Sequence, residues 1–126
     1  MAKVNIQPDC GNSPRKAFLK DLYISLANGD IDILKTNVQD NVNWQVAGQS
    51  QVTGKENFLK EIVEHKLWKV KEITVDTIIT HGPDASVSGQ IKATDNFKYA
   101  FCDIYKFKGA GGTTINSIMT FLVRQG

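Results

Sequence analysis

The chain has 126 residues, which fits one domain, since chains normally divide only beyond roughly 250 residues. With 41% hydrophobic and 22% charged residues, its composition is that of an ordinary globular protein and argues against a disordered chain. Fifteen basic and thirteen acidic residues leave a net charge of +2 with the signs interleaved. The chain therefore lacks the basic stripe that a nucleic-acid partner requires.

The beginning of the chain carries no uninterrupted apolar segment of the kind found in secretory signals. No apolar run approaches the roughly 20 residues that span a bilayer, so we expect no membrane association and a cytoplasmic location. Residues 1–12, with their proline and glycine, are predicted to form a flexible amino-terminal arm ahead of a single domain, residues 13–126. Cys10 and Cys102 form no disulfide framework, and both are predicted to be free thiols.

Two helices are predicted in the first third of the chain. A serine cap followed by Pro14, with apolar residues at helical spacing, predicts a helix over residues 14–27 that an Asn-Gly pair ends. Asp30 can cap a second, shorter helix, whose apolar residues continue to Val38. The two helices are expected to form a tight pair.

The next segments are a strand and a third helix. From Val42 the apolar residues recur at every second position, which predicts a half-buried strand that ends at Gly48. Thr53 and Glu56 then form a capping box, and the apolar stripe that follows continues to Leu67. A third helix is therefore predicted after this box.

The second half of the chain predicts four strands joined by turns. They cover residues 68–80, 85–94, 97–108 and 113–123. The glycine-rich turn between the last two is no phosphate-binding loop, because that chemistry needs a helix immediately afterwards. Within 97–108, the alternation places Asp103 in the middle of an aromatic face. Three helices and five strands in this order predict an α+β domain with a mainly antiparallel sheet and helices on one face.

Several short segments carry a resemblance through their order and spacing. They are Tyr23-Ile24-Ser25-Leu26, Gly29-Asp30-Ile31-Asp32, the strand end at Gly48, Gly54 before the third helix, and Cys102-Asp103-Ile104-Tyr105-Lys106-Phe107. Together they resemble the ketosteroid isomerase and SnoaL-like (polyketide cyclase) branch of the nuclear-transport-factor-2-like superfamily, over about Ser13 to Val123. The resemblance implies a cystatin-like fold, in which a curved sheet carries the three helices on its concave face and forms a cone-shaped barrel with a pocket.

The resemblance also implies roles for single residues in that pocket. Ketosteroid isomerase holds its substrate oxygen with a helical tyrosine and a strand carboxylic acid, which match Tyr23 and Asp103. Its proton-transfer aspartate falls on Val46, which cannot accept a proton. The later strands also lack the acid that SnoaL-type cyclases use. The sequence thus leaves open whether the chain is an enzyme, and it predicts no cofactor and no metal ion.

The pocket lining is predicted from the inward faces of the elements. The expected ligand-binding residues are Trp44, Val46, Phe58, Tyr99, Phe101, Tyr105, Ile118 and Thr120. Burial among aromatic rings would raise the pKa of Asp103, and a neutral carboxyl could then donate a hydrogen bond to a ligand oxygen. Alternatively, Asp103 bonds a tyrosine hydroxyl or an indole and simply ties down the sheet, with Tyr23 as part of the core.

Three functions therefore remain open. The favoured one is a domain that binds a small, mainly apolar molecule, with a possible isomerase- or lyase-type activity. The second is an isomerase, lyase or cyclase whose base lies outside the family positions. The third is a structural or interaction module whose pocket is filled core. Apolar residues on both faces of 97–108, together with the pairing common in the superfamily, predict a homodimer through the sheet.

Overall fold

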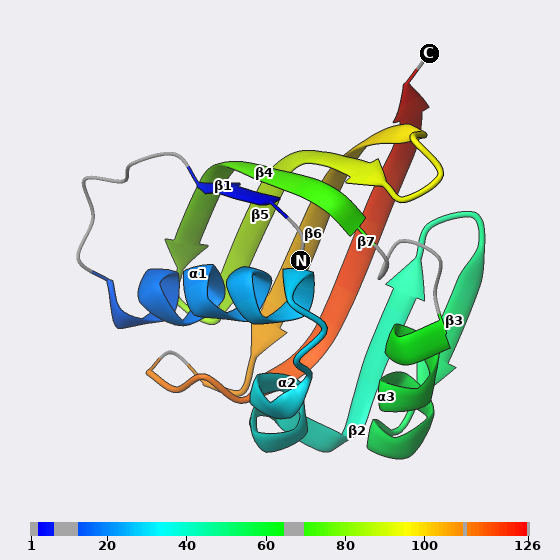
Figure 1. Ribbon diagram of the computed structural model, residues 1–126. Helices are drawn as coiled ribbons and strands as arrows, with labels where there is room; N and C mark the ends of the chain where they lie inside the picture. Colours follow the sequence, from blue (N-terminus) through cyan, green and yellow to red (C-terminus); the bar gives the residue numbers. More distant parts are fainter. Residues whose placement is uncertain (1–2, 7–12, 65–69, 110, 126) are drawn as a thin grey trace.

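One curved sheet organises the molecule, and three helices lie on one of its faces (Figure 1). The structure is a computed structural model that describes residues 3–6, 13–64, 70–109 and 111–125. The helices are α1 (Pro14–Ala27), α2 (Asp32–Asn37) and α3 (Lys55–Glu64). The strands are β1 (Lys3–Ile6), β2 (Val38–Val46), β3 (Ser50–Thr53), β4 (Val70–His81), β5 (Asp84–Ala93), β6 (Lys98–Phe107) and β7 (Ile115–Gln125).

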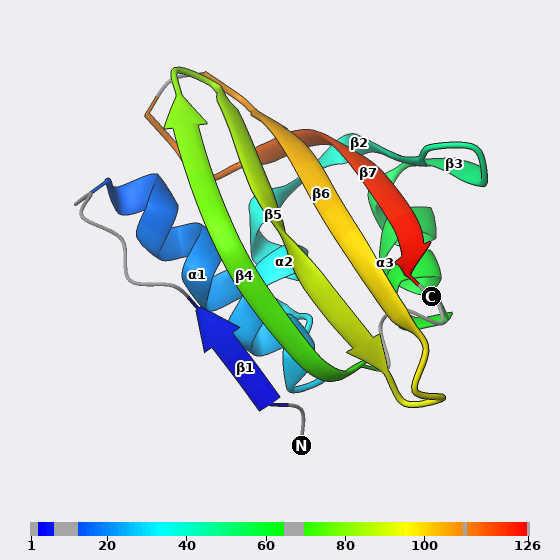
Figure 2. The ribbon, with the colours of Figure 1, turned by 90° about the horizontal axis from the view of Figure 1, so that it is seen from above.

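The strand order across the sheet is β1-β4-β5-β6-β7-β2-β3. Only β1–β4 and β2–β7 pair in parallel, so the sheet of the described residues is mainly antiparallel, as the sequence predicts. Helix α1 packs against β4 and β1 at one side, and α3 packs against β2 and β3 at the other. Among the described segments, no helix covers the opposite face of β4 to β7 (Figure 2). The predicted α+β architecture is therefore confirmed.

The predicted elements largely agree with the observed ones. Helix α1 has the predicted bounds. The N-cap position of α2 is Ile31 and not Asp30, although the Oδ1 atom of Asp30 accepts a hydrogen bond from the Asp32 N–H at 2.9 Å. Strand β2 begins at Val38, four residues before the start that alternation predicts. The predicted continuation of the third helix to Leu67 lies outside the described residues.

Two strands were not predicted. Residues 3–6, assigned to the flexible arm, form β1, which pairs with β4 from Lys3 opposite Glu72 to Ile6 opposite Val75. Four residues are too few for a recognisable period, and the strand depends on the free edge of β4. The remaining residues of the predicted arm lie outside the described ones. Strand β3 lies between the predicted strand end at Gly48 and the capping box at Thr53, where no element was predicted. It pairs with β2 because Gly48, with φ of 75°, closes a hairpin between them.

The apolar core lies between the concave face of the sheet and the helices. Its fully buried members include Leu19, Leu22, Leu34, Val42, Phe58, Val87 and Ile115. Strands β4 and β5 approach each other closely at Gly89, which pairs with Val75 beside a shift in the register of the two strands. A Cβ atom built on Gly89 would lie 1.9 Å from the carbonyl oxygen of Thr74, so only glycine fits at this position. No helix in the described part of the chain is long and apolar enough to cross a membrane.

Arg15 ties α1 to the turns at one end of the sheet. Its guanidinium donates hydrogen bonds to the carbonyl oxygens of Gly82 and Gly112, with the Nε atom 3.0 Å from the latter. The same group lies 4.3 Å from the centre of the Phe107 ring. Backbone carbonyls and an aromatic face therefore compensate the buried charge of Arg15, which fixes the helix over the sheet.

Candidate functional site

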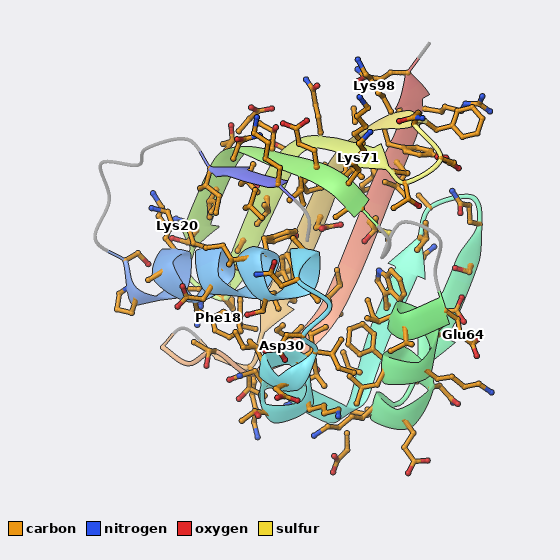
Figure 3. All side chains as sticks on the ribbon, in the orientation of Figure 1. Phe18, Lys20, Asp30, Glu64, Lys71 and Lys98 are labelled. Carbon is orange, nitrogen blue, oxygen red and sulfur yellow. The ribbon has the colours of Figure 1, made fainter. Side chains whose placement is uncertain are left out.

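A pocket of about 120 Å³ lies between the helices and the concave face of the sheet. Its lining comes from every helix and from five strands: Tyr23, Leu26, Ala27, Leu34, Trp44, Phe58, Ile62, Val70, Ile73, Ile91, Phe101, Asp103, Tyr105, Ile118, Thr120 and Leu122. Most of these side chains are apolar. Figure 3 shows the charged side chains of Lys71, Lys98 and Glu64 on the outside of the molecule, away from this interior.

The polar groups of the pocket form one hydrogen-bonded cluster. The indole Nε1 atom of Trp44 donates to Thr120 Oγ1 at 2.9 Å, and Thr120 Oγ1 donates to Asp103 Oδ1 at 2.7 Å. The hydroxyl of Tyr23 donates to the other carboxyl oxygen, Oδ2, of Asp103. The hydroxyl oxygens of Tyr23 and Tyr105 lie 2.7 Å apart. These five side chains form the polar end of the pocket and are called the Asp103 cluster below.

Strand register and helix packing bring the Asp103 cluster together. On the sheet, Asp103 lies opposite Val87 of β5 and Thr120 of β7, so the Thr120 hydroxyl is a direct cross-strand neighbour. Trp44 of β2 pairs with Ile118, two residues before Thr120. Tyr23 reaches the cluster from α1, and its ring stacks on Phe101 with the ring centres 5.9 Å apart.

The surroundings of the cluster perturb its titratable groups. Burial raises the pKa of Asp103, while the hydrogen bonds from Tyr23 and Thr120 oppose this shift by stabilising the carboxylate. Burial, followed by the nearby charge of Asp103, raises the pKa values of Tyr23 and Tyr105 well above their ordinary value. Both tyrosines therefore remain protonated at neutral pH and act as neutral hydrogen-bonding groups.

The pocket offers little for proton transfer. Among the described residues that line it, Asp103 is the only carboxylate, and there is no histidine, lysine or arginine. The two carboxyl oxygens already accept hydrogen bonds from the protein. Within the described part of the chain, no group of three potential metal ligands occurs. This arrangement can hold a polar atom of a ligand, but it lacks a second acid or base that would complete an isomerase site.

Most of the predicted site residues meet at this pocket. Those that line it are Tyr23, Trp44, Phe58, Phe101, Asp103, Tyr105, Ile118 and Thr120. Two predicted residues do not line it. Val46 is buried at the end of β2 beside Thr120, and Tyr99 lies opposite Ile91 near the start of β6. The aromatic alternation continues past the pocket, so it could not indicate where the lining ends.

The sequence analysis did not identify the apolar rim. Leu26, Ile62, Val70, Ile91 and Leu122 are half-buried residues that line the pocket. A signal existed for two of them, since Leu26 lies three residues after Tyr23 on the helix and Leu122 lies two residues after Thr120 on the strand. The others come from separate elements, and only the tertiary structure brings them to one opening.

The contacts of Asp103 have features of both predicted roles, a carboxyl that binds a ligand and a carboxyl that ties down the sheet. As the alternative reading predicts, the carboxyl bonds a tyrosine hydroxyl and thereby ties α1 to the sheet. The indole of Trp44 reaches Asp103 only through Thr120. Nevertheless, Asp103 also lines the pocket and is only half-buried. Its carboxyl therefore remains accessible to a small molecule.

Several solved structures have an architecture similar to that of this chain. A nuclear-transport-factor-2-like protein of unknown function from Cytophaga hutchinsonii is 19% identical, with a TM-score of 0.65 over 86% of this chain and 99% of that chain. A candidate ketosteroid isomerase from Kribbella flavida is 14% identical, with a TM-score of 0.73 over 89% and 79%. A candidate SnoaL-like polyketide cyclase from Jannaschia sp. is 10% identical, with a TM-score of 0.70 over 90% and 91%.

The chain therefore has the nuclear-transport-factor-2-like fold, which confirms the fold that the resemblance implied. Its structural neighbours include proteins of the ketosteroid isomerase and SnoaL-like types. No protein-family model matches the sequence, and no curated protein sequence matches it. At these low identities the likeness is one of fold, and the function has to be argued from the pocket itself.

Proposed function

We propose that this protein binds a small, mainly apolar molecule in the pocket and holds one polar atom of that molecule at Asp103. The observation that supports this most directly is the position of the Asp103 cluster. It forms the polar end of an otherwise apolar pocket, the pattern by which small-molecule sites combine apolar contact with a few orienting groups. A carboxyl that only tied down the sheet would not need to line a pocket.

Binding is favoured over catalysis because the described lining contains no second carboxylate and no histidine or lysine beside Asp103, and both tyrosines keep their protons at neutral pH. The position of the family's proton-transfer aspartate is occupied by Val46, whose side chain is buried outside the pocket. An isomerase or cyclase activity would need a base from elsewhere. The activities of the structural neighbours are therefore not carried over to this chain.

The proposal is tested by nuclear magnetic resonance, with a library of small fragments titrated into ¹⁵N-labelled protein. The indole N–H of Trp44 belongs to the Asp103 cluster and provides a resolved signal inside the pocket. We expect ligands to shift this signal and the amides of β6, and we expect Asp103→Asn to weaken their binding. Fragments that shift only surface residues, or an unchanged affinity in Asp103→Asn, would refute the proposal.

A further inference from the structure

Each hydrogen-bond donor of the Asp103 cluster donates its hydrogen to another member of the cluster. Trp44 donates to Thr120, and Thr120 donates to Asp103. On the other side, Tyr23 donates its only hydroxyl hydrogen to Asp103. The contact between Tyr23 and Tyr105 must therefore take its hydrogen from Tyr105. With Asp103 ionised, four hydrogens make four bonds within the protein.

The atoms of the Asp103 cluster that can still bind a ligand are hydrogen-bond acceptors. Each carboxylate oxygen offers about two acceptor positions, and each oxygen of Asp103 uses one of them in the bonds just described. The hydroxyl oxygen of Tyr105 keeps its lone pairs as well. A ligand carbonyl would meet only lone pairs here, whereas a ligand hydroxyl can donate its hydrogen. The state of the cluster thus selects ligands that carry a donor.

The size of the pocket sets a second condition. Its volume is about 120 Å³. A cavity of about 150 Å³ accommodates benzene, whereas sites for drug-sized ligands have roughly 300 Å³ or more. The pocket therefore holds about one six-membered ring. A second ring would have to lie in the mouth, beside the half-buried side chains of Leu26, Ile62 and Val70, where less apolar surface is removed from water.

We propose that the ligand of this pocket is a neutral hydroxyl compound with an apolar body of about one ring, whose O–H donates to the carboxylate of Asp103. This inference rests on the proposed function and specifies its ligand class. It differs from the carbonyl chemistry that a neutral Asp103 would serve. It also differs from a multi-ring ligand, whose second ring would have to lie in the mouth of the pocket.

A neutral hydroxyl fits better than an ammonium group. An ammonium carries three N–H donors, and each loses water when it enters the pocket. Apart from the lone pairs of the Asp103 cluster, the lining offers apolar side chains such as Ile73 and Phe101. A hydroxyl needs only one acceptor, which Asp103 supplies. The ammonium case remains a measurable outcome of the test below.

The test uses probes that differ in one group, and calorimetric titration at pH 8 measures their dissociation constants. Cyclohexanol is compared with cyclohexanone, which replaces the donor by an acceptor, and with cyclohexylamine, which carries the ammonium. Decahydro-2-naphthol adds a second ring. We expect cyclohexanol to bind at least about tenfold more tightly than cyclohexanone, because it makes a hydrogen bond to a charged group. Cyclohexylamine should bind more weakly than cyclohexanol, and the second ring should add less than tenfold.

Two further measurements link the preference to Asp103. In Asp103→Asn the side-chain amide supplies hydrogens, so the preference for cyclohexanol should fall at least threefold or reverse. The control is Asp84→Asn, the same change at an exposed carboxylate, which should leave the preference unchanged. Wild-type protein provides a second test that needs no variant. As pH falls, protonation of Asp103 adds one hydrogen to the cluster, so the affinity for cyclohexanone should rise towards that for cyclohexanol.

The titratable groups around Asp103 keep this pH test simple. From α1 and β6 the facing groups are Tyr23 and Tyr105, whose pKa values burial raises well above their ordinary value. Cys102 precedes Asp103 on the other face of β6, and burial raises the pKa of its thiol. The paired strands place Val87 and Thr120 opposite Asp103, and neither titrates. Asp103 is thus the group in this environment whose protonation the pH test follows.

The outcomes separate this inference from the proposed function. If no probe and no library fragment binds in the pocket, both are refuted. If the probes bind in the pocket but cyclohexanone or cyclohexylamine equals cyclohexanol, the binding function stands and the hydroxyl assignment is overturned. If decahydro-2-naphthol binds tenfold more tightly than cyclohexanol, the size assignment is overturned.

A pair of variants would then show whether the mouth of the pocket holds the second ring. Ile62→Ala changes a residue of the pocket mouth, and Val63→Ala, on the exposed side of α3, is the control.

Discussion

Tyr23 and Asp103, 80 residues apart in the chain, are joined by a hydrogen bond that connects α1 to the centre of β6. The bond performs two tasks. It anchors the first helix on the concave face of the sheet, and it fixes the direction of the carboxyl that lines the pocket. Stability and ligand binding therefore depend on the same pair of side chains.

Replacing this tyrosine should reveal both tasks. Tyr23→Phe removes the donor to Asp103 Oδ2 and the acceptor for Tyr105, so Oδ2 of Asp103 and the buried hydroxyl of Tyr105 both lose this partner. We expect the free energy of unfolding at pH 7 to fall by about 1–3 kcal/mol, measured by urea denaturation. Tyr99→Phe, the same change outside the pocket, is the control and should have a smaller effect. Equal losses in the two variants would show that the Tyr23 hydroxyl contributes nothing particular.

The pH dependence of stability should carry the signature of Asp103. Burial raises the pKa of this carboxyl in the folded state above the ordinary value of about 3.8. The folded protein then binds the proton more tightly than the unfolded chain. The resulting stabilisation is fully present below the unfolded pKa and is lost as pH rises through the folded pKa.

Urea denaturation at a series of pH values, compared with Asp103→Asn, isolates this contribution. The free energy of unfolding of the wild type, relative to the variant, should decrease as pH rises above about 3.8, then level off above the folded pKa of Asp103. The control is Asp84→Asn, the same change at an exposed position. The free energy of unfolding of the wild type relative to this variant should depend much less on pH. A relative stability that instead increases with pH across this range would mean that the bonds from Tyr23 and Thr120 outweigh burial.

The fold could be predicted further than the site. Periodicity and capping indicated α1, β6 and the helix that follows Gly54, because these elements carry their own patterns. Strand β1 could not be predicted, since it is short and its stability comes from the edge of β4. The hydrogen bond between Trp44 and Thr120 could not be predicted for a similar reason. It depends on the parallel register of β2 with β7, strands that are far apart in sequence.

Gly89 gives a test of the close approach of β4 and β5, two strands that contribute to the pocket lining. In Gly89→Ala, the new Cβ atom would lie 1.9 Å from the carbonyl oxygen of Thr74, so β4 and β5 would have to separate. We expect a loss of about 3 kcal/mol in the free energy of unfolding, at the upper end of the range for overpacking. The control is Gly111→Ala, where the added Cβ atom meets open space. Similar stabilities of the two variants would show that the strands can readily move apart.

The outer face of the sheet leads to a last prediction, about assembly. Side chains on the uncovered side of β6 and β7 include six without charge, Ala100, Cys102, Ile104, Met119, Phe121 and Val123, and Lys98 and Lys106 lie on the same side towards the two ends of β6. Ile104, Phe121 and Val123 are 40%, 43% and 64% exposed, so they form an apolar patch open to water. Ile104, Phe121 and Val123 carry no charge and Lys98 and Lys106 lie at the ends of the strand, so the centres of two such patches could meet without repulsion between like charges. We propose that a second copy of the chain covers this face.

Sedimentation velocity at micromolar concentration measures this directly. We expect a dimer for the wild type and a monomer for Phe121→Lys, because a lysine in the middle of the interface would face its symmetry mate and lose water without a partner. Val63→Lys is the matched control, since Val63 is 48% exposed on α3, away from the outer face. This variant should remain dimeric. A monomeric wild type would leave the patch without a second copy to cover it, and dimers in both variants would place the interface elsewhere.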